Sequence, residues 1–413
     1  MAELTIERLT DAVAGGAVAL RSIMRLQPAD GPGGKVFPPT YAVNAAHKYA
    51  VEERQIGDQL VVTVLLDSVA SQANRAEMAL LEGWETGELA FPVPYVDFRD
   101  EADADDLGRI TVLEAPHRLA DAIFRDSLLD GTLFRLSELG RAITDARPGN
   151  ATALFRSAPT ALLFGQWDST GPKGGLGSKF QRAYVSEIVG LNASVGVKVS
   201  SRIDPLQIER LAPDKIAFNH EDRAQVWTFD AEEAETGKGG KPEHASRGSE
   251  SGTAGQPSKI NHGNIAPSID SQAGGVTISE ARQTTVLSLA ALRRLRFAGH
   301  SREAQVAART AVAALGVAAV AYGHEADHDL RSRCLLVPEH APSLEVVGRD
   351  GSAPDAVDID RGSAQRLLSE AAAQAARAGI GWAEREIALR PAPKLVELLR
   401  RSREVSAREP AGE

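Results

Sequence analysis

The chain has 413 residues, 43% hydrophobic and 25% charged, a composition typical of a folded soluble protein with one large or two ordinary domains. Its net charge of −10 excludes a protein that binds nucleic acid over its whole surface, so any polyanion site must be local. A single cysteine, Cys334, excludes an intrachain disulfide and a cysteine zinc cage, which suits a reducing cytoplasm.

The N-terminal segment does not have the pattern of a targeting signal. Residues 1–24 carry acidic side chains early, and Gly15 and Gly16 interrupt their apolar stretch. We therefore expect no signal peptide. We also see no uninterrupted apolar run long enough to span a bilayer, and so expect no membrane contact.

The first predicted elements form a strand, a turn and a helix. Residues 59–66, QLVVTVLL, are rich in aliphatic and β-branched side chains and predict a buried strand that ends at Asp67. Residues 71–84 predict a helix, with Ser71 as its N-cap and Gly83 as its stop signal.

The next elements are separated by a charged segment, DFRDEADADD (97–106). Amphipathic spacing then predicts two helices, at 115–131 and 134–143. Beyond Pro148, strand-like patterns occur at 160–165, 183–205, 316–323 and 333–338, and 274–297 predicts a short strand followed by a helix. Further helices are predicted at 301–315, capped by Ser301, and at about 362–378, before a charged, fraying tail from Leu395. This irregular alternation predicts an α+β fold.

Residues 231–275 differ in composition from the rest of the chain. This glycine- and serine-rich segment has almost no large apolar side chains, so burial cannot offset the entropy lost on ordering it. We expect a mobile insertion that only a partner would order. A passive linker is an equally good interpretation of the composition.

The stretch GPKGGLGSKFQR (171–182) combines four glycines with three cations, which predicts close approach of an anion. A Walker A loop is disfavoured, because no serine or threonine follows Lys179 and a strand-like stretch replaces the required helix. The G-x-G-x-x-G pattern also fails after Gly175 and Gly177. Lys173, Lys179 and Arg182 instead suit the gripping of phosphates, with no catalytic group beside them.

A second group of cations lies in residues 281–310, which contain six arginines and one acid, Glu303. Such runs are often solvated faces, so this group indicates a polyanion site only in combination with the glycine-rich stretch. The arginines are Arg282, Arg293, Arg294, Arg296, Arg302 and Arg309.

Two patterns raise the possibility of catalysis. HEADH (324–328) matches H-E-x-x-H, in which two histidines on one helix face bind zinc and Glu325 acts as base, with His340 or Glu345 as a third ligand. The neighbouring strand-like pattern predicts instead a charged surface turn. Asp67 stands at a strand end, where catalytic carboxylates occur, but such a residue is more often a turn or cap. Gln72, Asn74 and Arg75 follow it and are candidates for phosphate or sugar contacts.

Several of these segments together resemble one family. The segments that show the resemblance are PPTYA (38–42), LLDSVASQANRAEMALLE (65–82), LLFGQWDSTGPKGGLGSKFQRAYVSEIVG (162–190), SSRIDP (200–205) and TISEARQTTVLSLAALRRLRF (277–297). They resemble the backbone subunit of type I-G CRISPR surveillance complexes, formerly type I-U, in the RAMP superfamily. The resemblance runs from about residue 36 to residue 340.

The resemblance implies a modified RRM-like, ferredoxin-type core with insertions and no catalytic activity or cofactor. It implies a subunit that polymerises along CRISPR RNA and holds its sugar–phosphate backbone, leaving the bases free to pair. No RNP1 consensus is present, and the few aromatic residues fit bases that need not stack. The implied RNA contacts are Asn74, Arg75, Lys173, Gly174, Gly175, Lys179, Arg182, Arg202, Arg293, Arg294 and Arg296.

The resemblance also implies partners and a domain organisation. The partners are CRISPR RNA, the target DNA strand through the guide, other Cascade subunits and further copies of this chain head-to-tail, with the acidic segment 97–106 as one contact face. We expect a backbone domain over residues 1–350, with a helical insertion at about 85–150 and a thumb-like insertion at 231–275. A helical extension and charged tail would follow at 351–413. Metal-dependent RNA cleavage by Asp67 and zinc hydrolysis by HEADH are the alternative functions.

Overall fold

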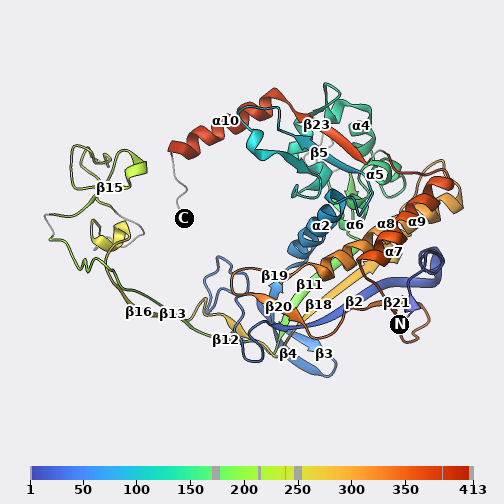
Figure 1. The fold of residues 1–413 in the computed structure, drawn as a ribbon, viewed down its shortest axis with the longest axis horizontal. Helices are drawn as coiled ribbons and strands as arrows, with labels where there is room; N and C mark the ends of the chain where they lie inside the picture. The colour runs from blue at the N-terminus through green and yellow to red at the C-terminus, as the bar shows by residue number, and fades with distance from the viewer. Residues whose placement is uncertain are drawn as a thin grey trace. The chain divides into compact units, whose positions relative to one another are not determined.

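The protein is described by a computed structural model that covers residues 2–169, 177–212, 215–237, 239–245, 254–383 and 385–408. The chain forms two compact units (Figure 1). The main unit comprises Met1–Tyr41, Tyr49–Ser194 and Val276–Arg400. The smaller unit comprises Ala42–Lys48, Val195–Gly275 and Arg401–Glu413.

A large, mainly antiparallel sheet is the centre of the main unit. β20 (Leu335–Pro338) pairs with β2 and with β19 (His328–Asp329) beside the main path of strands. Along that path the order is β1 (Ala2–Glu3), β22 (Asp355–Asp358), β21 (Leu344–Gly348), β2 (Ala17–Pro28), β18 (Glu280–Ser288), β11 (Tyr184–Leu191), β4 (Gln59–Asp67) and β3 (Val51–Ile56).

Two β-α-β crossovers interleave in this sheet. β2 and β11 are both antiparallel to β18, and the helix α2 (Val69–Glu85) precedes β11 in the chain. β18 and β21 are both antiparallel to β2, and the helix α8 (Arg302–Glu325) connects them. The order β21-β2-β18-β11 is therefore that of a split β-α-β unit. The predicted α+β class is confirmed, whereas the RRM-like assignment stays a prediction.

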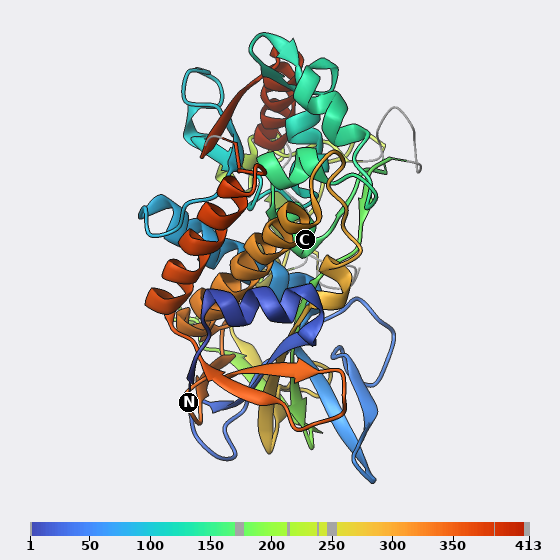
Figure 2. The same cartoon turned by 90° about the vertical axis from the view of Figure 1, so that its right-hand side faces the viewer.

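α8 is the central helix of the core. It contacts α2, α1 (Ile6–Asp11) and α9 (Arg361–Arg377), and helices cover the sheet in Figure 2. Its many alanines let neighbours approach closely. A Cβ on Gly316 would lie 2.7 Å from the Leu287 side chain of β18, so this glycine allows close packing of α8 on the sheet.

The sequence prediction for α8 was wrong in two respects. The helix does not end at residue 315, and residues 316–323 are not a strand, because one helix continues to Glu325. A fully buried helix has no polar face, so its apolar run resembles that of a buried strand. The helix is also long and apolar enough to cross a membrane, contrary to expectation, but 89% of its apolar window is buried inside the protein.

Other local predictions also needed correction. Residues 160–165 form not a strand but the short helix α6 (Thr160–Phe164). The helix predicted at 115–131 is mostly wrong: only α3 (Ala122–Arg125) is α-helical, capped by the Asp121 side chain, and Ser127–Leu129 form a strand. Gly83 does not end α2, since it lies inside the helix, where a Cβ would be 2.5 Å from the Tyr322 ring.

A second sheet in the main unit brings distant segments together. It contains β6 (Arg109–Thr111), β5 (Val93–Asp97), β23 (Glu386–Pro391), β7 (Ser127–Leu129) and β8 (Thr132–Leu133). The helix predicted at 134–143 begins later, because Ser137 caps α4 (Glu138–Thr144) after a 3₁₀ turn. The main unit also contains α5 (Thr152–Ser157) and α7 (Leu289–Leu292), and the predicted helix at 362–378 is confirmed as α9. The tail from Leu395, which was expected to fray, is helical as part of α10 (Pro393–Arg408).

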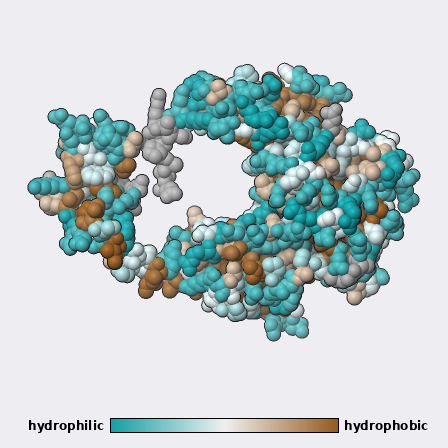
Figure 3. All heavy atoms as spheres, in the orientation of Figure 1, coloured by the Kyte–Doolittle hydropathy of each residue, from teal (hydrophilic) through white to brown (hydrophobic). Residues whose placement is uncertain are grey.

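The smaller unit is built on a two-stranded ribbon of β13 (Lys198–Arg202) and β16 (Ile265–Asp270). Part of the predicted insertion 231–275 lies outside the described residues, and the described part includes β16. A short pair, β14 (Phe218–Asn219) and β15 (Trp227–Thr228), packs near a small apolar cluster. Val199 and Ile269 are paired across the first ribbon and are 75% and 72% exposed, and Figure 3 shows hydrophobic surface there.

Candidate nucleic-acid interface

The start of α2 positions the first group of predicted site residues. Ser68, three residues before the predicted cap Ser71, is the N-cap, and its hydroxyl accepts a hydrogen bond from the Ser71 amide at 3.2 Å. The helix therefore begins directly after β4 and Asp67. Asn74 is exposed on its surface, whereas Gln72 is buried and faces the sheet, which argues against the predicted phosphate or sugar contact of Gln72.

Asp67 is fully buried and tied to three neighbouring side chains, a group that we call the Asp67 hub. Its carboxylate accepts hydrogen bonds from Gln72 Nε2 at 2.7 Å, Arg75 Nε at 3.0 Å and Arg331 Nη2 at 3.2 Å. Two guanidinium groups thus offset the cost of burying its charge. This arrangement gives Asp67 a structural role and does not favour the alternative in which it cleaves RNA.

Arg75 also uses its remaining donors within the protein. Its Nη2 donates to the Leu330 carbonyl at 2.6 Å, and its Nη1 lies 3.4 Å from the Asp329 carbonyl. The guanidinium therefore fastens α2 to the segment after α8. Its side chain is 37% exposed, but these internal hydrogen bonds use most of its donors. Arg75 is therefore a weaker candidate phosphate ligand than the sequence suggests.

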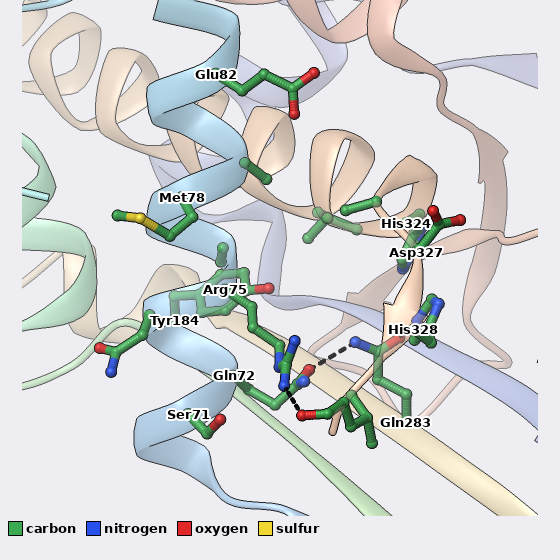
Figure 4. Close-up of a pocket in the computed structure, with 17 residues that line it drawn as sticks. Ser71, Gln72, Arg75, Met78, Glu82, Tyr184, Gln283, His324, Asp327 and His328 are labelled. Carbon is green, nitrogen blue, oxygen red and sulfur yellow. Dashed lines mark hydrogen bonds between the residues drawn. The ribbon is translucent and has the colours of Figure 1, made fainter. Parts of the chain in front are cut away.

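A cavity of about 430 Å³ lies beside this hub, between α2 and the end of α8 (Figure 4). On its floor, Gln72 Oε1 accepts hydrogen bonds from Ser186 Oγ at 2.9 Å and Gln283 Nε2 at 2.7 Å. Gln283 Oε1 in turn lies 3.3 Å from His328 Nε2. This chain of buried amides connects α2, β11, β18 and β19 and fixes the floor of the cavity.

The two histidines of HEADH line this cavity but do not share a helix face. α8 ends at Glu325, so His324 is in its last turn while His328 lies on β19. The zinc interpretation required both on one helix. The expected charged surface turn is confirmed only for 325–327, which are exposed, since His324 is half-buried and His328 is buried. Burial lowers the pKa of His324 to about 4 and also lowers the pKa of His328, so both rings are neutral near pH 7.

The predicted glycine-rich loop lies partly outside the described residues, which leaves Lys173, Gly174 and Gly175 without a structural description. Its two flanks pair as a short ribbon, β9 (Gln166–Trp167) with β10 (Lys179–Phe180), which we call the Trp167 ribbon. The Asp168 amide donates to the Ser178 carbonyl at 2.8 Å, and a Cβ on Gly177 would lie 2.2 Å from the Asp168 carbonyl oxygen. Gly177 is thus required for close approach of the two flanks.

Three predicted cations gather at this ribbon, namely Lys179, Arg182 and Arg294, which we call the basic patch. All three are exposed. Arg294 Nη1 donates to Gln181 Oε1 at 2.9 Å, so the loop after α7 is joined to the segment 179–182. This contact brings together two basic segments that are more than a hundred residues apart in the chain.

The remaining predicted cations are placed elsewhere. Arg293 donates to the carbonyls of Ala12 and Val13 at 3.2 and 3.3 Å, and burial lowers its pKa, so it mainly stabilises the fold. Arg296 is exposed but donates to the Arg293 carbonyl at 2.6 Å. Arg202 belongs to the smaller unit, where it donates to the His262 and Gly263 carbonyls.

Residues 20–195 match the family model described as "CRISPR-associated protein GSU0053". The match indicates a CRISPR-associated protein. It covers less than half of the chain, but it includes β4, α2 and the Trp167 ribbon. No curated protein sequence matches the chain.

Sequence reasoning missed two features of this site. The partners Gln283, His328 and Arg331 were not linked to Asp67 and Gln72, because strand order and not local spacing brings them together. Trp167 was also overlooked, although an aromatic residue directly before a glycine- and lysine-rich loop is a recognisable signal.

Proposed function

We propose that this chain is a non-catalytic backbone subunit of a type I-G CRISPR surveillance complex, which binds CRISPR RNA through its phosphates. In this proposal it acts in the cytoplasm, and copies of the chain stack head-to-tail along the guide together with other Cascade subunits. The bases stay available to pair with the target DNA strand.

The observation that carries this proposal is the basic patch on the Trp167 ribbon. Lys179, Arg182 and Arg294 are exposed cations on an otherwise acidic protein, and they flank a loop whose glycines allow close backbone approach. The match to a CRISPR-associated family includes this ribbon. The interleaved β-α-β order supports the implied RRM-like core.

The polar groups inside the site are used by contacts within the protein. The Asp67 carboxylate accepts hydrogen bonds from two arginines and a glutamine. The described residues contain no group of three or more histidine, cysteine, aspartate or glutamate side chains arranged to hold a metal ion. These observations give no support to the two hydrolytic alternatives.

The proposal is tested by purifying the chain from its native host under low-salt conditions and sequencing any bound nucleic acid. We expect short RNA of uniform length that carries a constant repeat-derived portion and a variable portion. A preparation free of RNA, together with no binding of added RNA at low ionic strength, would contradict the proposal.

A cleavage assay tests the non-catalytic part. The purified complex is incubated with RNA complementary to the guide and with divalent metal ions. We expect intact RNA with the wild-type chain and with Asp67→Asn. Metal-dependent cleavage that Asp67→Asn abolishes would instead establish the nuclease alternative.

A further inference from the structure

The Trp167 ribbon has an inner and an outer face. Gln166 and Phe180 are each 5% exposed and anchor the inner face. Trp167 and Lys179 are direct partners across the two strands, so their side chains share the outer face. Trp167 is 56% exposed, and it is the one tryptophan of the chain's four that is exposed.

This ribbon is held firmly in place. Asp168, which follows Trp167, forms an ion pair with Arg135 Nη2 at 2.9 Å, and both side chains are largely buried. The contact between the Asp168 amide and the Ser178 carbonyl closes the ribbon, and Gly177 leaves no room for a side chain there. The indole is therefore presented on a fixed support, which reduces the entropy lost when a ligand stacks on it.

The surroundings of the indole select the chemistry of its ligand. Lys179 Nζ lies 5.1 Å from the centre of the Trp167 ring, in a cation–π contact. Arg182 follows Lys179 closely in the chain, Arg294 is joined to the neighbouring Gln181 by a hydrogen bond, and Arg135 compensates the charge of Asp168. A flat apolar face beside exposed cations suits a ligand that has both an aromatic ring and a negative charge, as each unit of a single-stranded nucleic acid has.

We propose that Trp167 is a stacking platform for one unpaired base of the bound RNA. In this arrangement Lys179 leaves the indole and contacts a phosphate, and the base takes its place on the ring. The inference rests on the proposed RNA-binding function and amends the expectation that bases need not stack on this protein. It assigns the patch two separable contributions, one to phosphates and one to a base.

The test compares Trp167→Phe, which keeps an aromatic face, with Trp167→Leu, which keeps apolar bulk without it. Each full-length variant is titrated with single-stranded oligouridylate and with an abasic oligomer of the same length and phosphate count. We expect Trp167→Leu to bind oligouridylate about 5- to 100-fold more weakly than wild type and the abasic oligomer equally well, whereas Trp167→Phe retains most of the affinity. The salt dependence should stay unchanged in both variants.

Tryptophan fluorescence gives a second readout that does not depend on the leucine variant folding normally. We expect oligouridylate to quench the wild-type emission, and this quenching to disappear in Trp167→Phe. Quenching that persists in Trp167→Phe would overturn the inference.

Other outcomes separate this inference from the proposed function. Equal binding of oligouridylate by wild type and Trp167→Leu would overturn the stacking role and leave RNA binding intact. Equal losses for both oligomers would also overturn it, since the base would then be irrelevant. A leucine variant that loses only self-association in the absence of RNA would assign Trp167 to a protein contact, and a wild-type chain that binds neither oligomer would overturn both proposals.

Discussion

The Asp67 hub and the basic patch both concentrate charge, but they use it differently. In the hub, one buried carboxylate is matched by two arginines and a glutamine, and Arg75 also donates to two carbonyls. In the patch, Lys179, Arg182 and Arg294 are exposed, Lys179 lies over a tryptophan ring, and Arg294 donates to a glutamine side chain. A cation cluster in a sequence therefore indicates a ligand only if the fold leaves its charge uncompensated.

The largest effect should come from breaking the hub. Asp67→Ala leaves Arg75 and Arg331 without their buried partner, and we expect the free energy of unfolding to fall by about 3–5 kcal/mol. Urea denaturation measures this change. As the control, Glu3→Ala removes an exposed partner of Arg366 and should change the free energy by about 1 kcal/mol or less. A hub variant as stable as this control would show that Asp67 is not structural.

Lower pH should reduce the stability of the protein through His324, which lines the cavity beside the hub. Burial lowers its pKa to about 4 from its ordinary 6.5, with a contribution from His328. His324 therefore becomes protonated below about pH 6.5 in the unfolded chain but only below about pH 4 in the folded chain. The free energy of unfolding decreases as the pH falls between these two values. The expected loss is about 1.4 kcal/mol per pH unit.

His324→Gln isolates this contribution, because His328 and all other titrating groups remain. We expect urea denaturation at about pH 7 and about pH 5 to show a smaller pH dependence in the variant than in wild type. Identical pH dependence in the two proteins would mean that His324 is not buried in its neutral form.

The stability of the Trp167 ribbon, which carries Lys179 of the basic patch, should be sensitive to a single added methyl group. Gly177→Ala places a Cβ 2.2 Å from the Asp168 carbonyl oxygen, so the ribbon must shift, and we expect a loss of about 1–3 kcal/mol in stability together with weaker RNA binding. Gly323→Ala is the matched control, since its Cβ would meet no atom within 4 Å inside α8, and it should be neutral or stabilising. Equal behaviour of the two variants would contradict the close approach at Gly177.

The smallest effect should come from the acidic segment 97–106. Asp103→Lys with Asp105→Lys reverses two exposed charges in the face proposed to meet the next copy. Each ion pair lost across such a contact should weaken it by about 1 kcal/mol or less. We expect weaker assembly on RNA in sedimentation experiments. Glu53→Lys with Asp58→Lys, on the β3–β4 hairpin, is the charge-matched control. Unchanged assembly would exclude the acidic segment as the contact.

The two regions also differ in how far the sequence predicts them. The β4–Asp67–α2 unit and the cap at Ser301 follow from local patterns, and the structure confirms both. The choice between Ser68 and Ser71 as cap was wrong, because either serine could begin a helix there and the end of β4 decides it. The hub was not predictable, since Asp67 and Arg331 are 264 residues apart and meet only in the folded chain.

The basic patch, unlike the hub, was predicted largely from the sequence. Its residues were identified from the glycine-rich stretch 171–182 and the arginines of 281–310, and their exposure agrees with a binding role. Sequence alone could not separate Arg294, which is exposed, from Arg293, whose donors are used by Ala12 and Val13. Adjacent side chains in the turn at the end of α7 point in different directions, and only packing decides which direction is the interior.

The most direct test of the central claim is the salt dependence of RNA affinity in Lys179→Ala with Arg182→Ala. If both cations contact phosphates, the slope of log affinity against log salt should fall by about 1.4, or about 0.7 for each contact on a single strand, equally for RNAs of different sequence. Arg366→Ala with Arg390→Ala, which removes two exposed arginines outside the patch, should leave the slope unchanged. A slope identical to wild type, or a loss confined to some RNA sequences, would contradict the account.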